Sequence, residues 1–398
     1  MTRAACGGSL ARMTSPFASD DGPLGVLVAG AGVAGLETMV ALRGLAHDAV
    51  APTLVAPDGV FSLRALGVYE AFGHAPARRY RVSALARALD AGRRRDALAS
   101  VDRARREVRL RSGNVVPYDV LVVAVGAIAY PAFDHGVLFD LPRNGEAVEA
   151  MLRDVRAGRV DSVAIVVPRR SAWPFPAYEL ALLLASVRPP QGLAVTLVTP
   201  ELEPLAAFGP PATEMIRAEL DASGIELVCG VTARVPSARI LELPHGRRIR
   251  AARIVHLPGM AGPRISGLPC DPDGFVRVGA DLHVDDDPDV FAIGDGIAGP
   301  HKHGGLAVLQ ADAVAQEIAR RAGAAFAPRA YRPALHAVLR TEHGPRYLRA
   351  EPPGGGGECV VSDECLWWPP TKVASRWLTP WLAAIEPGVA GQRPAPTD

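Results

Sequence analysis

Short runs of apolar residues recur along the chain, and most of them border a segment whose apolar positions have helical spacing. Residues 24–28 and 51–56 border the first such segment, and residues 160–167 and 193–199 border another, near residues 177–186. Continuous apolar runs that alternate with helices are typical of buried strands in parallel sheets. The pattern therefore predicts an α/β fold with two βαβ units, one near the start of the chain and one in its middle.

A glycine-rich turn joins the first predicted strand to its helix. It reads Gly30-Ala31-Gly32-Val33-Ala34-Gly35. In a strand–turn–helix context, the first glycine permits a sharp turn and the second lets the backbone approach a pyrophosphate. The N-terminus of the following helix attracts the phosphates. We interpret the turn as a dinucleotide site; the alternative is a glycine-rich loop without a ligand.

The second predicted strand ends without the acidic residue that usually holds an adenosine ribose at such a site. Ala56 stands at that position, and Asp58 follows two residues later. Asp58 or backbone groups are the candidates for the ribose contact. Residues 61–64 follow in a predicted loop, where Arg64 is a further candidate contact.

Two later segments extend this pattern. Residues 118–126 read as a buried strand that ends at Gly126, and residues 288–296 read as a strand that runs into a Gly-Asp turn. A predicted helix from about Leu306 to Arg321 follows. With the first turn, these segments resemble the two-part FAD signature of the pyridine nucleotide-disulfide oxidoreductase superfamily.

The resemblance implies an FAD-dependent oxidoreductase with two Rossmann-like FAD/NAD(P)-binding domains. It implies that Asp295 bonds a ribityl hydroxyl of FAD, and that the helix N-terminus near Leu306 faces the flavin N1–C2=O edge, where it stabilises the anionic reduced form. Lys302 either adds a positive charge there or faces solvent. No catalytic side chain is assigned, because the flavin carries the chemistry, and no metal site is expected. The expected cofactor contacts are Gly30, Ala31, Gly32, Val33, Ala34, Gly35, Asp58, Arg64, Gly126, Gly294, Asp295, Lys302, Gly305 and Leu306.

The turn of the middle βαβ unit differs from the first. Residues 168–179 contain three prolines and several aromatic residues but no glycine. Such a loop disfavours close approach of its backbone to a pyrophosphate, and hence NAD(P)H binding there. Arg169 and Arg170 offer an alternative, since their side chains can hold phosphate.

Within the superfamily, the chain most resembles the branch of the sulfide:quinone oxidoreductases, flavocytochrome c sulfide dehydrogenases and type II NADH dehydrogenases. The Ala177-Tyr178-Glu179-Leu180 segment resembles the sulfide-oxidising members. Residues 171–176 contain no cysteine, however, so the cysteine of those enzymes is missing and persulfide chemistry is not expected. Cys359 and Cys365 are expected to be buried or incidental thiols, with a redox pair as the alternative.

The C-terminal segment holds four of the five tryptophans, together with Lys372 and Arg376. In the branch that the chain resembles, this region covers the flavin, and in quinone-using members it touches the membrane. Two interpretations stay open. The segment meets a membrane interface, or it closes over the FAD domain or a second subunit of a homodimer; the prolines at 369, 370 and 380 favour the second.

The charge balance narrows the class of protein. The formal net charge is +1, from 43 basic and 42 acidic residues, which argues against a nucleic-acid binder. The first 20 residues lack the apolar core of a signal peptide. We therefore expect a cytoplasmic protein, with peripheral contact at the inner face of the membrane as the alternative.

The sequence predicts a flavoenzyme that takes electrons from a small-molecule donor and passes them to a quinone or another small acceptor. The alternatives are an NAD(P)H-dependent flavin reductase with a diverged nicotinamide site, and a non-catalytic redox sensor or scaffold that binds flavin. The expected organisation is a disordered leader (1–23), a discontinuous FAD-binding domain (24–131 and 270–323), an NAD(P)-binding-like middle domain (132–269), a C-terminal cap (324–385) and a disordered tail (386–398).

Overall fold

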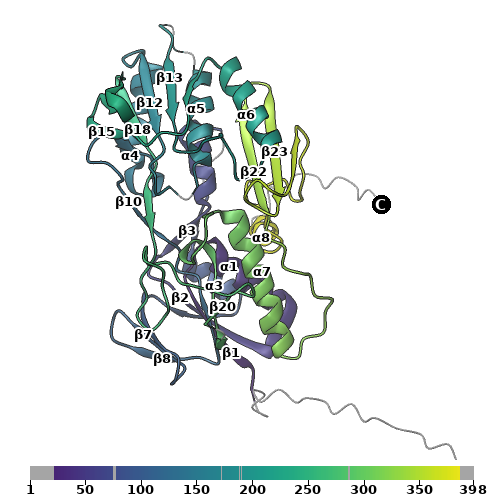
Figure 1. The fold of residues 1–398 in the computed structure, drawn as a ribbon. Helices are drawn as coiled ribbons and strands as arrows, with labels where there is room; N and C mark the ends of the chain where they lie inside the picture. Colours follow the sequence, from purple (N-terminus) through teal and green to yellow (C-terminus); the bar gives the residue numbers. More distant parts are fainter. Residues whose placement is uncertain are drawn as a thin grey trace, which may run out of the picture.

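The structure is a computed structural model that describes residues 22–74, 78–171, 173–187, 189, 191–285 and 287–385. Most of the predicted leader and the whole predicted tail lie outside the described residues. Figure 1 shows two α/β regions, one above the other, with a C-terminal antiparallel sheet at the side of the upper one.

The lower region is built on a six-stranded sheet whose strands come from two distant parts of the chain. Its order is β20 (His283–Val284), β21 (Asp287–Ala292), β9 (Val120–Val123), β1 (Leu24–Ala29), β2 (Val50–Val55) and β5 (Gly92–Arg94). Neighbouring strands are parallel except β20 and β21. Helices α1 (Val33–Ala46) and α7 (Gly304–Arg321) pack against each other beside this sheet. Because β1 and β9 are buried along most of their length, their apolar runs lack polar alternation.

The lower region also contains smaller elements. They are β3 (Val60–Ser62) and β4 (Arg79–Arg81), α2 (Gly67–Ala71), α3 (Val82–Ala88), and a meander of β6 (Leu98–Asp102), β7 (Glu107–Leu110) and β8 (Val115–Pro117). The residues predicted as a loop after the second strand therefore begin in a short strand, which pairs with β4.

The upper region is built on a five-stranded parallel sheet. Its order is β11 (Val137–Leu138), β18 (Arg253–His256), β12 (Ser162–Val166), β13 (Ala194–Val198) and β14 (Glu226–Val228). Its helices are α4 (Leu141–Arg156), α5 (Phe175–Val187) and α6 (Pro210–Ala222), and its outer hairpins are β15 (Arg234–Ser237), β16 (Ile240–Glu242) and β17 (Arg248–Arg250). An antiparallel pair, β10 (Ile128–Tyr130) and β19 (Gly259–Ala261), lies between the two regions (Figure 1).

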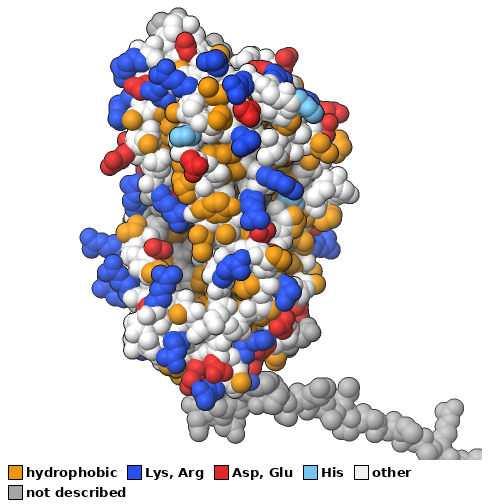
Figure 2. Space-filling model, turned by 60° about the vertical axis from the view of Figure 1, so that its left-hand side comes forward, with side chains coloured by type: hydrophobic (Ala, Val, Ile, Leu, Met, Phe, Trp, Pro, Cys, Tyr) orange, Lys and Arg blue, Asp and Glu red, His pale blue; other side chains and the backbone are white. Residues whose placement is uncertain are grey.

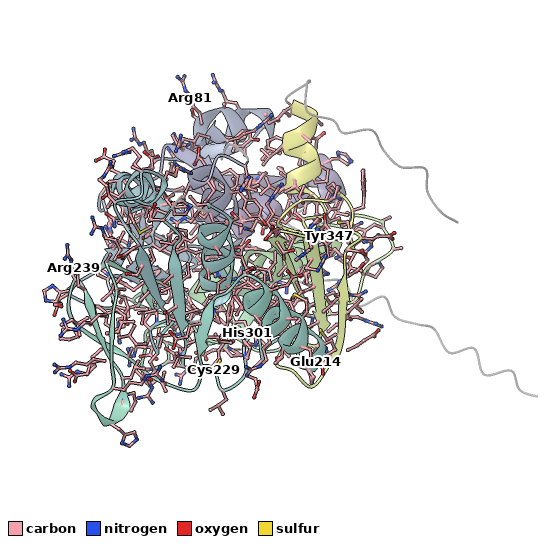
Figure 3. The ribbon with its side chains drawn as sticks, turned by 90° about the horizontal axis from the view of Figure 1, so that it is seen from above. Arg81, Glu214, Cys229, Arg239, His301 and Tyr347 are labelled. Carbon is pink, nitrogen blue, oxygen red and sulfur yellow. The ribbon has the colours of Figure 1, made fainter. Side chains whose placement is uncertain are left out.

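The C-terminal segment contacts both regions. Strands β22 (Leu335–Thr341), β23 (Gly344–Glu351) and β24 (Glu358–Ser362) form an antiparallel sheet that packs on α5 and α6. In the view from above, this sheet, which carries Tyr347, lies beside α6, which carries Glu214 (Figure 3). The chain then returns to the lower region, where α8 (Leu378–Ile385) packs on α1. The predicted α/β fold class is confirmed.

The surface and the helix lengths bear on the expected partners. On the face seen in Figure 2, Lys and Arg side chains are spread out and interspersed with acidic and hydrophobic ones. Among the described residues, no helix is both long and apolar enough to cross a membrane.

Candidate functional site

The glycine-rich turn between β1 and α1 is pressed against the end of β9. Gly30 has φ +121°, and a Cβ on it would overlap the backbone oxygen of Ala124. A Cβ on Gly35 would overlap the backbone oxygen of Gly30. These two positions therefore require glycine for the fold itself.

Gly32 differs from both of these glycines. It is exposed, and a Cβ on it would meet no atom within 4 Å. It is also the N-cap of α1, and no side chain caps that helix. The first N–H groups of α1, near Ala31 and Val33, are thus open to a ligand that accepts hydrogen bonds, such as a phosphate.

The other predicted segments converge on the same turn. A Cβ on Gly294 would lie 3.1 Å from Cβ of Ala34, and one on Gly296 would lie 3.0 Å from the backbone oxygen of Gly126. The turn after β1, the end of β9 and the turn after β21 therefore meet at one place. We call this junction, residues 30–35, 124–126 and 294–296, the cradle.

Asp295 projects from the cradle as a half-buried carboxylate. Burial raises the pKa of Asp295, and the positive charges of Lys302 and Arg64 oppose that rise. Within the described ranges, no protein donor bonds this carboxylate. It is left to accept a hydrogen bond from a ligand hydroxyl.

Lys302 is buried, so the alternative of a solvent-facing lysine is wrong. Its ammonium donates to the backbone oxygen of Ile297 and lies 4.0 Å from the centroid of the Phe275 ring. Burial lowers its pKa, and the charge of Asp295 opposes that shift.

Helix α7 begins at Gly304, two residues before the predicted start at Leu306. His303 is its N-cap, and the imidazole Nδ1 accepts a hydrogen bond from the Leu306 N–H at 3.3 Å. A Cβ on Gly305 would lie only 2.6 Å from Cε1 of this imidazole, which explains the glycine there. Burial lowers the pKa of His303 to about 3, so the ring is a neutral cap at physiological pH.

Asp58 is exposed, and the structure gives its carboxylate no role in the cradle. Its backbone oxygen accepts a 3.4 Å hydrogen bond from Nη2 of Arg93, on the neighbouring strand β5. At the expected position of the ribose acid, the buried Ala56 donates its N–H to the backbone oxygen of Arg94. Arginines rather than acids therefore border this end of the cradle.

These residues fit FAD. An open helix N-terminus at Gly32 suits its pyrophosphate, the unsatisfied carboxylate of Asp295 suits a ribityl hydroxyl, and the α7 N-terminus lies nearby. The contact predicted for Asp58 has no such support.

In the middle βαβ unit, aromatic side chains gather at the turn between β12 and α5. The loop between β12 and α5 carries Trp173, whose ring lies 4.5 Å from that of His303, 5.6 Å from that of Phe175 and 5.8 Å from that of Phe208. An aromatic cluster thus occupies the loop and contacts the start of α7.

The second feature of the middle unit is an internal hydrogen bond at the end of β13. The hydroxyl of Tyr178, on α5, donates to the Glu201 carboxylate at 2.5 Å, and the hydroxyl of Thr199 donates at 3.2 Å. Burial raises the pKa of both Glu201 and Tyr178. The carboxylate that follows β13 is thus bound by the protein itself.

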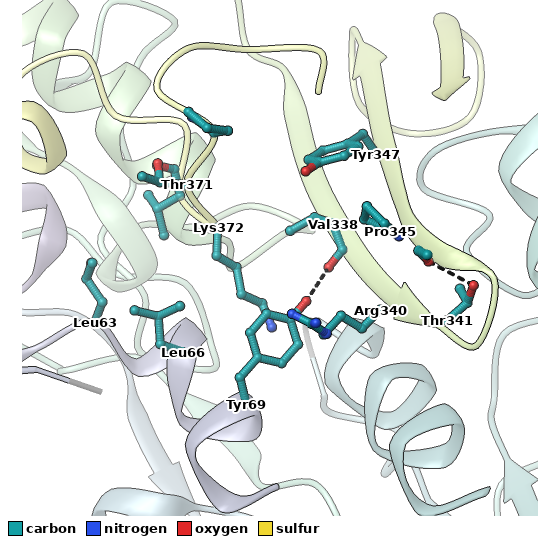
Figure 4. Close-up of a pocket in the computed structure, with 13 residues that line it drawn as sticks. Leu63, Leu66, Tyr69, Val338, Arg340, Thr341, Pro345, Tyr347, Thr371 and Lys372 are labelled. Atoms are coloured by element: carbon teal, nitrogen blue, oxygen red, sulfur yellow. Dashed lines mark hydrogen bonds between the residues drawn. The ribbon is translucent and has the colours of Figure 1, made fainter. Parts of the chain in front are cut away.

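A cavity of about 480 Å³ lies between α2, the C-terminal sheet and residues 370–373 (Figure 4). Its walls combine aromatic and aliphatic side chains with two cations, Arg340 and Lys372. Val373 connects it to the cradle, since a Cβ on Gly304 would lie 3.6 Å from Val373 and 3.9 Å from Val33. The cavity therefore adjoins the starts of α7 and α1.

A buried ion pair stands beside this cavity. The Lys372 ammonium donates to the Glu179 carboxylate and lies 3.7 Å from the centroid of the Tyr69 ring. Both side chains of the pair are less than a tenth exposed. Burial raises the pKa of Glu179 and lowers that of Lys372, while their mutual attraction opposes both shifts.

The chain has only two lysines among its 43 basic residues, Lys302 and Lys372, and both are buried near the cradle. This count was available in the sequence and would have singled out both residues. The Glu179 partner was not visible, because 193 residues separate it from Lys372.

The C-terminal tryptophans are in different environments. Trp377 and Trp381 pack against the core of the lower region, Trp367 donates to the backbone oxygen of Thr371, and Trp368 is exposed. The four described cysteines are free; Cys359 is half-buried, and Cys365 is exposed. Cys6 lies outside the described residues.

Comparison with known proteins finds a family match for the middle of the chain and similar folds for most of it. Residues 175–319 match the family model described as pyridine nucleotide-disulphide oxidoreductase, whereas no curated protein matches the chain. The structure is similar to a sulfide:quinone oxidoreductase from Aquifex aeolicus, with TM-score 0.75, 20% identity, and coverage of 85% of this chain and 87% of that one. It is also similar to a ferredoxin reductase from Rhodopseudomonas palustris, with TM-score 0.63, 20% identity and 82% of each chain covered.

A third similar structure is an NAD-dependent persulfide reductase from A. fulgidus, with TM-score 0.62 and 18% identity over 82% of this chain and 64% of that one. These likenesses show a shared fold. The family match over residues 175–319 and the shared fold confirm the predicted resemblance to the pyridine nucleotide-disulphide oxidoreductase superfamily. They agree with the predicted FAD-dependent oxidoreductase.

Proposed function

We propose that this protein passes electrons from a small donor through FAD in the cradle to a quinone or a similar planar acceptor in the adjoining cavity. The observation that carries the proposal is the buried Lys372–Glu179 pair, which stands at the cavity next to the start of α7. When bound, FAD would supply the two-electron relay between donor and acceptor.

The cavity suits a ring-shaped acceptor. Its volume lies within the usual range for small-molecule sites. Its apolar and aromatic walls include Leu63, Leu66, Val338 and Tyr347. In Figure 4 the Tyr69 ring lies between Lys372 and Arg340, and its hydroxyl donates to the backbone oxygen of Val338 at 3.2 Å. Tyr69 is thus fixed as part of the wall.

The charged pair can supply one of the two protons that quinone reduction needs besides electrons; reduced flavin would supply the other together with the electrons. Reduction of a quinone to a hydroquinone consumes two electrons and two protons. Because burial moves the pKa values of Glu179 and Lys372 toward each other, a proton passes between them more readily than between two exposed groups. The Lys372 ammonium can donate to a carbonyl oxygen of the acceptor, with Glu179 as its partner in proton exchange.

The comparisons support the acceptor more than the donor. One similar structure is named a sulfide:quinone oxidoreductase. Since residues 171 and 173–176 include no cysteine and place Trp173 beside His303, we do not propose sulfide as the donor.

A rapid-mixing experiment with Lys372→Met tests this function. The FAD-loaded protein is photoreduced without oxygen and mixed with a short-chain ubiquinone, and the return of the oxidised flavin band is timed. We expect the variant to lose on the order of 10²-fold in the limiting rate, the lower range for a lost general acid. Arg239→Met, at an exposed outer turn, is the control and should reoxidise like the wild type. Equal rates in Lys372→Met and wild type would rule out this role.

A further inference from the structure

Glu37 is a completely buried carboxylate on α1, the helix that begins at the cradle. Its oxygens accept four hydrogen bonds from the C-terminal segment. The donors are the hydroxyl of Ser375 (2.6 Å) and the backbone N–H groups of Arg376 (3.1 Å), Trp377 (3.0 Å) and Leu378 (2.7 Å). One side chain from the first helix thus satisfies the open N–H groups at the start of α8, the last described helix.

A second carboxylate, on α7, also binds this part of the C-terminal segment. Asp312, on α7, accepts from the indole Nε1 of Trp377 at 2.5 Å and from the Arg376 guanidinium at 3.3 Å. We call residues 375–378, together with Glu37 and Asp312, the C-terminal clamp. Because burial of a carboxylate without partners is costly, Glu37 stabilises this region only when the segment is in place.

The clamp begins three residues after Lys372, and the intervening turn is braced. The backbone oxygen of Val373 accepts from the Ser375 N–H at 2.8 Å and from the Thr371 hydroxyl at 2.7 Å. When Ser375 is held in place, these two hydrogen bonds also hold Val373 and Thr371, the residues on either side of Lys372. Val373 itself lies against the start of α7, so the turn has a fixed surface beneath it.

We propose that Glu37 is a positioning residue that holds Lys372 at the acceptor cavity through the C-terminal clamp. This inference rests on the proposed function for its kinetic consequence, but not for its structural one. Glu37 does not line the acceptor cavity, so it acts only through the segment that it binds.

The kinetic test uses Glu37→Gln, which keeps the side-chain size but replaces one acceptor oxygen by a donor. In the variant, Lys372 would lie at the cavity in only a fraction of the molecules, and the acceptor would bind to those molecules. The apparent affinity for the acceptor therefore falls in proportion to that fraction. We expect KM for a short-chain ubiquinone to rise about 10-fold, while kcat changes less than about 3-fold. A purely structural loss would instead lower the active fraction, and thus kcat, at constant KM.

The second readout uses a lysine-specific protease, because the chain contains only Lys302 and Lys372 as cleavage sites. Cleavage after Lys372 releases residues 373–398, and cleavage after Lys302 serves as the internal control. We expect Glu37→Gln to accelerate cleavage at Lys372 and to leave cleavage at Lys302 unchanged. The milder Ser375→Ala should show a smaller effect, and Glu149→Gln, an exposed carboxylate on α4, should show none.

The outcomes separate the two proposals. Unchanged KM in Glu37→Gln overturns the positioning role, whether or not cleavage at Lys372 accelerates. If the wild type reduces no quinone, the proposed function fails, and the protease alone decides: faster cleavage at Lys372 sustains the role of Glu37 in holding Lys372, and equal cleavage overturns it. Simultaneous acceleration at Lys302 would mark general unfolding and would also overturn it.

Discussion

The two βαβ units of this chain have the same topology but different turns. In β1–α1–β2, Gly30 and Gly32 leave the start of the helix open, and Gly32 borders free space. In β12–α5–β13, the turn carries Trp173 and prolines, and aromatic side chains fill it. The parallel pairing of strands is thus independent of the nucleotide site, which is determined by a few residues at the turn.

The residues that follow the second strand of each unit, β2 and β13, also differ, and here the middle unit is the one with the residue typical of a nucleotide site. After β2 the expected acid is replaced by Ala56, whereas after β13 there is an acid, Glu201, which Tyr178 already occupies. The first unit has the glycine-rich turn but no acid after its second strand. The second unit has an acid after its second strand but no glycine-rich turn. We infer that the open N-terminus of α1, and not an acid after the second strand, makes the first unit a cofactor site and leaves the middle unit a structural one.

The largest expected effect comes from Gly30→Ala. The added Cβ would overlap the Ala124 backbone oxygen at a φ that alanine rarely adopts, so backbone strain and a clash add together. We expect a loss of unfolding free energy of about 3 kcal/mol or more. Denaturant unfolding of the flavin-free protein measures it; a loss below about 1 kcal/mol would contradict the geometry.

Gly32→Val is the matched change at the open position. Since the new side chain meets no protein atom and only the N-cap preference of glycine over valine is lost, we expect the flavin-free protein to lose no more than about 1 kcal/mol of stability. The same side chain would stand where the pyrophosphate approaches, so FAD affinity should fall on the order of 100-fold, about 2.7 kcal/mol. Fluorescence titration of the flavin-free protein with FAD decides this, and unchanged affinity would place the cofactor elsewhere.

In the middle unit, Tyr178→Phe should destabilise the protein without affecting FAD. The change removes the 2.5 Å hydrogen bond and leaves the half-buried Glu201 carboxylate with fewer donors, although Thr199 still donates to it. A hydrogen bond to a charged group contributes about 1.5–3 kcal/mol. Thermal unfolding and FAD titration together test this; an equal loss of FAD affinity would mean that the two units are not independent.

The effect that is smallest near neutral pH concerns His303, where the Trp173 cluster meets α7. Burial lowers the pKa of His303 to about 3, below the unfolded value of about 6.5. The unfolded state therefore takes up a proton first, and stability is lost as pH falls below about 6.5, by up to about 1.4 kcal/mol per pH unit. His303→Asn keeps an acceptor for the Leu306 N–H but does not titrate, so its stability should fall less steeply. Identical pH profiles would show that the pKa of His303 is the same in the folded and unfolded states, contrary to its burial.

The sequence was sufficient for the cradle because its signal is local. Each of its segments is a strand followed by a glycine at a strained or closely packed turn, and such patterns do not depend on distant residues. The ribose contact of Asp58 stays a prediction: its carboxylate is exposed three residues beyond the end of β2, where Arg93 and Arg94 of β5 lie beside it.

The cavity and the clamp were not predictable from such patterns. The Lys372–Glu179 pair and the bonds of Glu37 to residues 375–378 join positions that lie between 193 and 341 residues apart. Polar residues of this kind resemble solvent-exposed ones in sequence, since their burial depends on tertiary packing. For the same reason, the sequence left open whether Lys302 adds a positive charge at the flavin site or faces solvent.

The contrast between the two units is tested most directly by adding NADH, without oxygen, to the purified FAD-loaded protein while the visible flavin band is recorded. We predict that the band persists, because aromatic side chains occupy the turn after β12. After photoreduction, the band should return on addition of a short-chain ubiquinone. Prompt bleaching by NADH would contradict the account, since it would show that the middle unit admits a nicotinamide nucleotide despite Trp173 and the Tyr178–Glu201 bond.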